Sequence, residues 1–378
     1  MSLGRLVFGM TGAEGVTGGI ASANQNILRA LSDLSKERAV PLTVLSYHED
    51  DDARPSYLSK RDAFRGMRGS RVRFARELAW RAARKDTVFL DHVALARPLL
   101  PFGRTAGRRT VIFAHGSESW RRVRTQAKTS FRAAELCLTN SDFTLRKMRE
   151  TFDGFRGQAC PLGLPPSIEL NERPPEQQDP APVLEAADGV ERPIGDRSLL
   201  LVARLHPGER EKGHTQLIEA LPDLKRRFPD VQLVFPGPGE DRTRLGRLAI
   251  GCDVADSVFL PGYLPTDELG MLYAHSYAYV MPSKQEGFGL TYLEAMNFAK
   301  PCVGSRDDGA EDVIVDGETG FLVADRDDQA SLVEVLSQML SDPDAAARMG
   351  VAGLKRLNQR FTAGHFQKRI RDAVGPLL

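Results

Sequence analysis

The stretch Pro282-Ser-Lys-Gln-Glu-Gly-Phe-Gly-Leu-Thr-Tyr-Leu-Glu-Ala-Met296 decides how the rest of the chain is interpreted. It follows the apolar run 276–281, passes Gly287 and Gly289, and continues with apolar residues at helical spacing. This order predicts a strand, a glycine-rich loop and a helix, which together offer backbone N–H groups and a positive helix end to an anion. The alternative is a tight turn whose carboxylates, Glu286 and Glu294, are only solvated.

Length and composition predict a two-domain globular protein. A chain of 378 residues is too long for one ordinary core, and its 42% hydrophobic and 27% charged residues are typical of a soluble protein. The four cysteines are far apart and match no zinc spacing, which favours a reducing compartment. We find no signal peptide and no run of about 20 apolar residues, so we expect a cytoplasmic protein without a spanning helix.

Charge is distributed unevenly along the chain. Residues 1–190 hold 29 Lys/Arg and 22 Asp/Glu, and the rest holds 22 and 28, so the two parts carry +7 and −6 and sum to +1. Residues 55–124 hold 17 basic and 5 acidic side chains, a net charge of +12. Three interpretations stay open at this point: a solvated face, a nucleic-acid surface, or a patch attracted to anionic lipid or substrate.

The first part of the chain alternates short apolar runs with helical patterns. A strand at 6–9 leads into a glycine-rich loop that ends at Gly18 and Gly19, and a helix follows at 20–31. The loop is neither a Walker sequence nor a G-x-G-x-x-G fingerprint, so alone it is a weak phosphate signal. After a strand at 41–46, Asp50 and Asp52 could form a D-x-D metal motif, but nothing apolar frames them and a hydrophilic turn is favoured.

Further strands are expected in the same part, at 87–90, 110–114 and 136–139. The segment 60–85 is basic and helix-prone, and 140–152 predicts a strand end, a cap and a helix. His115 directly follows one of these strands, at the edge where open α/β sheets bind ligands. The alternation predicts a doubly wound parallel sheet.

A second α/β series follows a Pro-rich and acidic segment, residues 165–197, which we interpret as a linker. Its first strand, 199–203, ends at Arg204, and Lys212 lies in the loop beyond. Strands at 231–235 and 257–260, the opening stretch, and two helices near 329–339 and 345–360 complete the series.

Several motifs in this second part occur together in a fixed order. They are Val202-Ala-Arg-Leu-His-Pro-Gly-Glu-Arg-Glu-Lys-Gly-His214, Pro261-Gly-Tyr-Leu264, the stretch from Pro282 with its E-x7-E pair, and Asp316-Gly-Glu-Thr-Gly-Phe-Leu322. The ordered set resembles the retaining glycosyltransferases of family 4, which have the GT-B fold and are of the group 1 type. The first part matches less fully, at Gly18-Gly19, His115-Gly116 and Asn140-Ser141.

The resemblance implies two Rossmann-like doubly wound domains that face each other across a central cleft. The first domain, 1–190, would bind the acceptor, the second, 191–360, would bind a nucleotide sugar, and 361–378 would return to the first domain. Arg204 and Lys212 would hold the diphosphate, which agrees with the charge that builds on such a leaving group.

The other implied roles divide between the donor's sugar, ribose, base and phosphates. Glu286 would contact the donor sugar, Glu294 the ribose hydroxyls, and His115 would lie near the reacting sugar. The catalytic set is therefore His115, Glu286, Arg204 and Lys212. The donor-binding set is Gly18, Gly19, Arg204, Lys212, Gly262, Tyr263, Glu286, Gly287, Phe288, Gly289, Leu290 and Glu294.

Two features limit or sharpen the resemblance. Where the family often has a histidine after Gly18-Gly19, this chain has Asn24, so a contact there is lost or replaced by an amide hydrogen bond. The E-x7-E pair alone would also suit the acid and base of a glycosidase. The upstream Arg204 and Lys212 favour transfer instead, because a hydrolase of sugars does not need a grip on a diphosphate.

We predict a retaining glycosyltransferase that moves a sugar from a UDP- or GDP-sugar to a saccharide or lipid-linked acceptor in polysaccharide or cell-envelope synthesis. No side chain stands out as a nucleophile, so front-face substitution is expected, without a cofactor or metal because the cations supply the charge. The basic segment 55–124 suggests attachment to an anionic membrane surface at its inner face, and no nucleic-acid partner is predicted. The alternatives are a nucleotide-sugar epimerase and a non-catalytic nucleotide-sugar-binding subunit.

Overall fold

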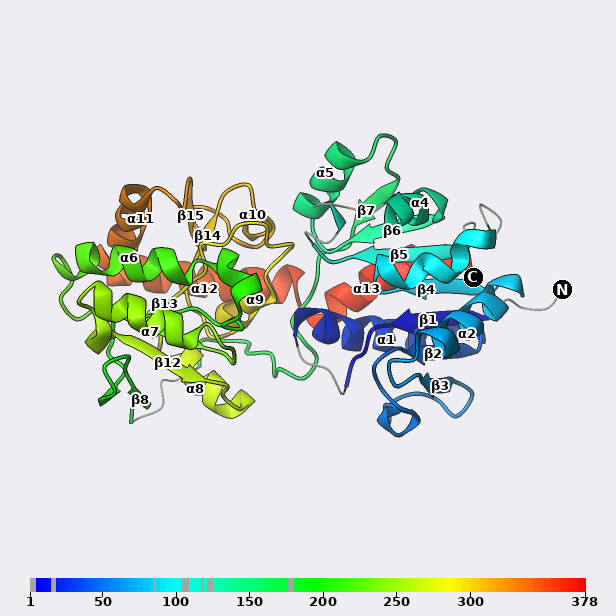
Figure 1. Ribbon diagram of the computed structural model, residues 1–378, viewed down its shortest axis with the longest axis horizontal. Coiled ribbons are helices and arrows are strands. Elements are labelled where there is room, and N and C mark those ends of the chain that lie inside the picture. Colours follow the sequence, from blue (N-terminus) through cyan, green and yellow to red (C-terminus); the bar gives the residue numbers. More distant parts are fainter. Residues whose placement is uncertain are drawn as a thin grey trace. The chain divides into compact units, whose positions relative to one another are not determined.

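The computed structural model describes residues 5–14, 18–84, 86–102, 109–116, 119–120, 125–175 and 180–378. The chain divides into two compact units: unit 1 comprises Met1–Glu169 and Arg360–Leu378, and unit 2 comprises Leu170–Gln359. Each unit is built on its own parallel sheet (Figure 1). This confirms the predicted α/β class with two Rossmann-like parallel-sheet domains.

The sheet of unit 1 is wound outward from β1. Its order is β3-β2-β1-β4-β5-β6-β7, and the printed pairings are all parallel. The order in which successive strands are added to the sheet reverses beside β1, so the loops at the carboxyl ends of β1 and β4 diverge and leave room for a ligand. The strands are β1 (Leu6–Met10), β2 (Leu42–Ser46), β3 (Ala63–Gly66), β4 (Thr87–Leu90), β5 (Thr110–Ala114), β6 (Leu136–Thr139) and β7 (Gly157–Ala159).

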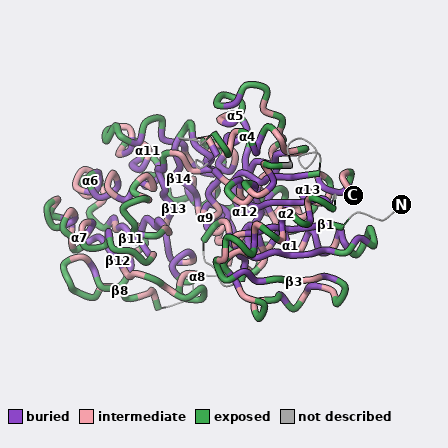
Figure 2. The backbone as a smooth tube through the Cα atoms, turned by 45° about the vertical axis from the view of Figure 1, so that its right-hand side comes forward, coloured by how far each residue is buried: buried purple, intermediate pink, exposed green. Residues whose placement is uncertain are grey.

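Helices cover both faces of this sheet because side chains along each strand alternate between the faces. One face packs its apolar residues, among them Val7, Leu45 and Ile112, against α2 (Arg71–Ala83), η2 (Val93–Phe102), α4 (Thr125–Ala133) and α5 (Asp142–Thr151). The central strands β1, β2, β4 and β5 are buried along their whole length, and Figure 2 draws buried residues in purple. A sheet buried on both sides explains why its strands are near-continuous apolar runs.

The C-terminal helix α13 (Ala363–Val374) belongs to unit 1. It lies beside α1 (Gly19–Arg38), as the red and blue helices in Figure 1 show. Phe366 is fully buried, with its ring centroid 6.0 Å from that of Phe113 in β5. Gln367 donates a hydrogen bond to Asn26 of α1 at 3.0 Å, and Arg369 donates to the carbonyl of Pro161 at 3.0 Å. Residues 360–378 thus complete the core of unit 1, whose other residues are Met1–Glu169.

Unit 2 repeats the same plan with strand order β12-β11-β10-β13-β14-β15. The strands are β10 (Ser198–Leu200), β11 (Gln232–Pro236), β12 (Val258–Gly262), β13 (Ala278–Val280), β14 (Cys302–Ser305) and β15 (Gly320–Val323). The helices are α6 (His214–Lys225), α7 (Arg242–Gly251), α8 (Thr266–His275), α9 (Leu290–Asn297), α10 (Ala310–Val313), α11 (Gln329–Ser341) and α12 (Pro343–Arg360). The reversal beside β10 brings the loops after β10 and β13 to neighbouring positions, because these strands pair directly.

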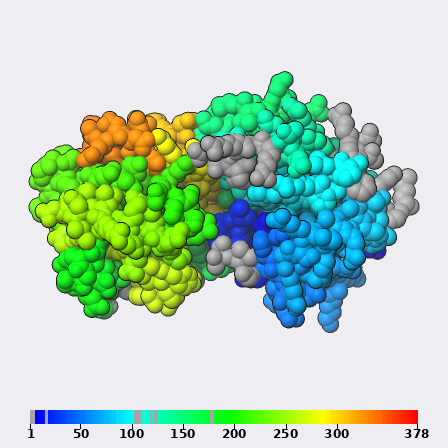
Figure 3. Space-filling model, viewed as in Figure 1, coloured from blue at the N-terminus to red at the C-terminus, as the bar shows by residue number. Residues whose placement is uncertain are grey.

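The structure differs from the sequence-based expectation in two segments. The helix-prone segment 60–85 begins with β3, a half-exposed edge strand that carries little apolar alternation. The predicted linker 165–197 contains a hairpin of β8 (Val183–Glu185) and β9 (Glu191–Pro193), which appears as a green lobe on unit 2 in Figure 3. The hairpin binds the edge of β12 through the amide of Ala187 and the carbonyl of Val258 at 2.8 Å. It therefore belongs to unit 2, which begins at Leu170 and not at residue 191.

Candidate active site

The opening stretch forms the predicted strand, loop and helix. β13 ends at Val280, the loop runs to Gly289, and α9 begins at Leu290. Gly289 has a φ of +85°, and a Cβ there would lie 2.5 Å from the Tyr292 ring, so the turn requires glycine. The Tyr292 hydroxyl donates a hydrogen bond to the carbonyl of Met281 at 2.6 Å. The first turn of α9 is therefore held against the end of the strand.

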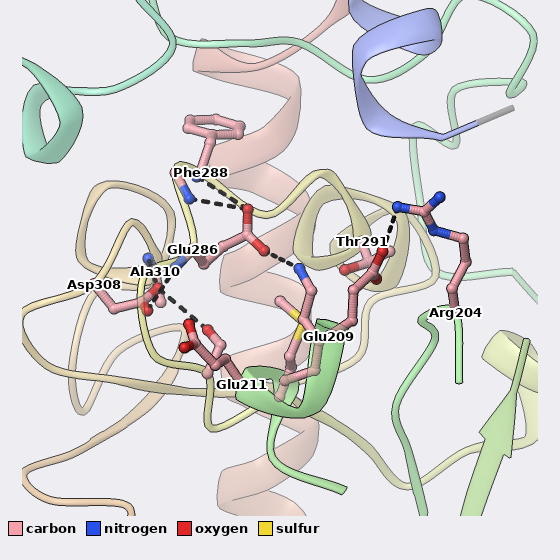
Figure 4. A network of polar contacts seen from close by, with 12 residues as sticks. Arg204, Glu209, Glu211, Glu286, Phe288, Thr291, Asp308 and Ala310 are labelled. Carbon is pink, nitrogen blue, oxygen red and sulfur yellow. Dashed lines mark hydrogen bonds and ion pairs between the residues drawn. The ribbon is translucent and has the colours of Figure 1, made fainter. Parts of the chain in front are cut away.

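Glu286 is the acceptor around which this loop folds. One carboxylate oxygen, Oε1, accepts hydrogen bonds from the amides of Gly287 at 3.0 Å and Phe288 at 3.4 Å. The other oxygen, Oε2, accepts from the ammonium of Lys212 (Figure 4). Burial opposes ionisation, but Lys212 and the two amides outweigh it and lower the pKa of Glu286. Amides that we assigned to the donor thus contact this carboxylate.

Lys212 and Arg204 come from the loop region that follows β10. Lys212 ends the 3-10 segment η4 (Pro207–Lys212), and its side chain is 27% exposed. Burial disfavours its charge, but Glu286, Glu209 and Asp308 together outweigh that effect and raise the pKa of Lys212. Arg204 is 67% exposed and forms an ion pair with Glu209. The shielded cation, Lys212, therefore pairs with Glu286 of the loop, and the exposed cation, Arg204, pairs with Glu209 of its own segment (Figure 4).

Asp308 is a member of this site that the sequence analysis missed. It follows β14, is 1% exposed, and accepts hydrogen bonds from the Ser283 hydroxyl at 3.2 Å and from the amides of Glu286 at 3.0 Å and Ala310 at 3.3 Å. Burial, and next the charge of Glu286, raise the pKa of Asp308 to about 8. None of the motifs in the sequence analysis includes Asp308, which lies between the stretch from Pro282 and the Asp316–Leu322 motif.

Glu294 lies inside α9 and contacts a neighbouring helix. Its Oε2 accepts a hydrogen bond from the hydroxyl of Tyr273, in α8, at 2.8 Å. Burial raises the pKa of Glu294, although this bond opposes the shift. The contact of Glu294 with the ribose hydroxyls of the donor stays a prediction. The tyrosine orients one carboxylate oxygen, which the sequence pattern did not indicate.

The remaining predicted donor residues of unit 2 lie at the end of β12. Gly262 has a φ of +80° and its carbonyl accepts from the amide of Gly237 at 2.7 Å. Tyr263, which follows it, is 70% exposed. A largely exposed aromatic ring at the carboxyl end of a parallel strand is suited to contact a nucleotide base. The donor contact of Tyr263 stays a prediction.

Unit 1 holds the other predicted residues. Gly18, with a φ of +112°, precedes α1, and Gly19 is the first residue of that helix. His115 follows β5, with its ring centroid 4.8 Å from that of Phe113. Burial lowers the pKa of His115 to about 3, and the nearby His92 adds to the effect. The imidazole is therefore neutral at physiological pH and suited to hydrogen bonding, not to acting as a cation.

Asn24, where the sequence departs from the family pattern, holds the glycine-rich loop. Its amide nitrogen donates to the carbonyl of Gly12 at 2.8 Å and to the carboxylate of Asp91, after β4, at 2.7 Å. Asp91 also accepts from the amide of Thr11 at 2.8 Å, and burial raises its pKa. On the other side, Glu49 accepts from the amide of Ala13 at 2.9 Å. Glu49 is buried, whereas Asp52, in the hydrophilic turn expected just after it, is exposed.

Two features are absent from the described residues, a cluster of metal ligands and a membrane-spanning helix. In those ranges no group of three or more His, Cys, Asp or Glu side chains could hold a metal ion. Asp50 of the D-x-D motif accepts from the amide of Asp52 at 3.1 Å and caps a 3-10 turn. Within the same ranges no helix has the length and apolarity needed to cross a membrane.

Comparison with known proteins identifies the class that this fold and site define. A solved structure of Anabaena HepE in complex with UDP and glucose superposes with a TM-score of 0.74 at 15% identity, covering 98% of this chain and 100% of that one. A sucrose-phosphate synthase from Thermosynechococcus elongatus gives a TM-score of 0.73 at 18% identity, covering 99% of each chain. At these identities the likeness is one of fold alone, the two-domain GT-B fold.

Sequence comparison gives the family. The model of the glycosyl transferases group 1 matches residues 189–356, which include the whole site of unit 2. A GDP-mannose-dependent alpha-(1-6)-phosphatidylinositol monomannoside mannosyltransferase of Mycolicibacterium smegmatis is 32% identical over 297 residues, covering 76% of this chain and 74% of that protein. The chain belongs to the glycosyl transferases of group 1 and is a glycosyltransferase.

Proposed function

We propose that this glycosyltransferase is a retaining mannosyltransferase that uses GDP-mannose as donor and a phosphatidylinositol-linked mannoside as acceptor. The observation that carries the choice of sugar and acceptor is the 32% identity, over 297 residues, to a protein named for that activity. The site is compatible with any nucleoside-diphosphate sugar, so the donor base and the sugar are the parts that the experiment below tests.

The donor end of the proposal rests on the Lys212–Glu286 pair. An ammonium has three N–H donors, and Glu286 accepts one of them, so Lys212 can still donate to a phosphate. Arg204, which is exposed, would reach the second phosphate by leaving Glu209. Two cations offset the charge that develops on the departing diphosphate, and no metal ion is needed for that purpose in this proposal. Glu286, held by two amides and Lys212, would accept hydrogen bonds from the sugar hydroxyls.

We expect retention of the anomeric configuration. Among the described residues near the site, the carboxylate of Glu286 already accepts from Lys212 and two loop amides, which makes it a poor nucleophile. A substitution on the front face, in which the leaving phosphate takes the acceptor's proton, needs no side-chain nucleophile. NMR of the product distinguishes this outcome through the one-bond coupling between C1 and H1, which differs between an axial and an equatorial anomeric bond. The H1–H2 coupling does not serve, because H2 of mannose is equatorial and this coupling is small in both anomers.

The acceptor end of the proposal rests on the charge of unit 1 and on the outer face of α2. Val72 is 78% exposed and Trp80 is 47% exposed, and the Arg84 guanidinium lies 4.7 Å from the Trp80 ring. Arg71, Arg73 and Arg76 are exposed on the same helix. Exposed apolar and aromatic side chains among arginines suit the interface of an anionic membrane, where a lipid-linked acceptor would reside.

The donor is tested by thermal unfolding and calorimetry with GDP-mannose, GDP-glucose, UDP-glucose and ADP-glucose. A ligand at 100 times its Kd stabilises the folded state by about 2.7 kcal/mol. We expect this shift with GDP-mannose, followed by mannosyl transfer to a phosphatidylinositol monomannoside. Binding of UDP-glucose alone would refute the donor assignment. A free isomerised sugar without acceptor would favour an epimerase, and binding without turnover would favour a non-catalytic subunit.

The membrane interface is tested by sedimentation with vesicles that contain phosphatidylinositol at low salt. We expect wild-type protein to bind and a variant of three α2 arginines to lose most binding. The control reverses two exposed charges on α7 of unit 2, and it is expected to bind like wild type. Equal binding by all proteins would refute the role of α2. The test variant is Arg71→Glu/Arg73→Glu/Arg76→Glu, and the control is Arg242→Glu/Arg247→Glu.

A further inference from the structure

A buried arginine in the loop between β15 and α11 contacts the main chain of the site. Arg326 is 7% exposed. Its Nη1 donates hydrogen bonds to two main-chain carbonyls, those of Glu211 and of Pro282, the second at 3.1 Å. Its Nε lies 3.4 Å from a carboxylate oxygen of Asp327. Neither the motifs nor the spacing of the sequence indicated this residue.

The two carbonyls belong to the two loops that carry the site's central ion pair. Glu211 immediately precedes Lys212, and Pro282 begins the loop that reaches Glu286. These loops also touch directly, since the amide of Lys284 donates to the carbonyl of Glu211 at 2.8 Å. Arg326 Nη1 and the Lys284 amide thus share one acceptor, and the loops meet at that atom.

The same contact explains a glycine in the first loop. Gly213 has a φ of +103°, and a Cβ there would lie 2.7 Å from the Pro282 ring and 2.8 Å from its carbonyl oxygen. The loops are therefore packed without space for a side chain between them. A small shift of either loop would move Lys212 relative to Glu286, because each residue is within a few positions of the contact.

A buried guanidinium is expensive unless its N–H groups find acceptors. An apolar residue at this place would satisfy neither carbonyl, and a guanidinium has a planar set of donors that can satisfy both. We propose that Arg326 is a positioning residue of the donor site, which joins the loops 207–213 and 282–289 and so fixes how Lys212 and Glu286 face a diphosphate sugar. This inference rests on the proposed donor site, but not on which nucleotide or sugar occupies it.

The expected effect is on donor use more than on stability alone. A misplacement of a catalytic group by about 1 Å can cost about 100-fold in rate. Arg326→Met keeps most of the apolar stem and removes every N–H donor. We expect it to lower kcat/KM for the donor by about 10- to 100-fold, through both a higher donor KM and a lower kcat, with the acceptor KM unchanged.

The experiment compares three variants of the full chain. Arg326→Lys retains a charge and donors for one of the two carbonyls, so we expect it to recover part of the lost kcat/KM. Arg306→Met is the matched control, because Arg306 pairs with Asp316 at the surface of the same unit and contacts neither loop carbonyl. It is expected to retain wild-type donor kinetics.

Hydrogen exchange supplies a readout that does not depend on the proposed function. We expect peptides covering 207–213 and 282–289 to exchange about tenfold faster in Arg326→Met, and at the wild-type rate in Arg306→Met. Failure of wild-type protein to bind any nucleotide sugar would refute the proposed function and leave the exchange result standing. Unchanged exchange in these peptides would overturn the role of Arg326, as would donor kinetics within twofold of wild type. If Arg326→Met does not fold, the same comparisons with Arg326→Lys decide, since wild-type behaviour of that variant in both measurements would also overturn it.

Discussion

The contact between Lys212 and Glu286 yields a prediction that separates the stability of the site from its activity. Lys212→Met removes the cation and leaves the Glu286 carboxylate with the two loop amides as donors. Breaking a fully buried pair costs about 3–5 kcal/mol, and breaking an exposed pair costs about 0–1 kcal/mol. The two side chains are 27% and 17% exposed, which places the expected loss between these limits, at about 1–3 kcal/mol.

The second variant, Lys212→Met with Glu286→Gln, removes both charges. This double variant has no uncompensated buried carboxylate. We therefore expect it to recover about half or more of the stability lost in Lys212→Met, because neutral replacements of a buried pair are often tolerated. Activity should behave differently. Both variants lack the cation at the diphosphate, and we expect kcat/KM to fall by about 100- to 1000-fold in each.

Urea and thermal unfolding, together with steady-state kinetics, check both statements. For a unit of this size, a loss of 1–3 kcal/mol corresponds to a decrease in Tm of about 2–12 °C. The Glu286→Gln single variant completes the double-mutant cycle and gives the coupling energy of the pair. A double variant no more stable than Lys212→Met would refute the argument about stability. A double variant with wild-type kcat/KM would refute the role of the pair in transfer.

Three further variants test other contacts. Asp308→Asn should become more stable relative to wild type as pH rises from about 4 to 8, as measured by urea unfolding. The pKa of Asp308 in the folded state, about 8, lies above its unfolded value, so the stability that the protonated side chain contributes to the wild type is lost through that range. A stability difference that does not change with pH would contradict this. Phe366→Ala should cost about 3–5 kcal/mol in equilibrium unfolding, since its ring is fully buried against Phe113 of β5; less than 1 kcal/mol would show that α13 is dispensable. Gly309→Ala would place a Cβ 2.4 Å from the carbonyl carbon of Gly287, so donor kcat/KM should fall about tenfold or more; wild-type kinetics would mean that the two loops adjust freely.

Much of the fold could be predicted because buried parallel strands are apolar runs that end at glycine, proline or polar residues. The strand at Leu6–Met10 and the helix at Leu290–Asn297 fall where the sequence placed them. The elements that the sequence did not predict are exposed or short. The helix at Arg242–Gly251 buries only Leu245 and Ala249, so its helical periodicity is weak. The hairpin at 183–193 alternates exposed residues and gains its place only by pairing with the edge of the larger sheet.

The sequence named several residues of the candidate site, but it did not predict which of them contact one another. The glycine-rich loop, Glu286 and Lys212 are recognisable from local sequence, because a turn that needs glycine and a charged motif leave a pattern over a few residues. Asp308 and Arg326 leave no such pattern. Each is a single charged residue in a loop, and single charged residues in loops are usually solvated.

By itself the sequence determined that the chain forms two α/β domains and that it carries the motifs of a glycosyltransferase, since apolar periodicity and loop motifs are local properties. Only the tertiary structure decided which groups meet. Lys212 and Glu286 are 74 positions apart in the chain, and they pair because β10 and β13 lie side by side in the sheet. The same neighbourhood brings in Arg326 and Asp308. Burial then fixes their charges and partners, because a buried charge is stable only where the fold supplies acceptors or an opposite charge.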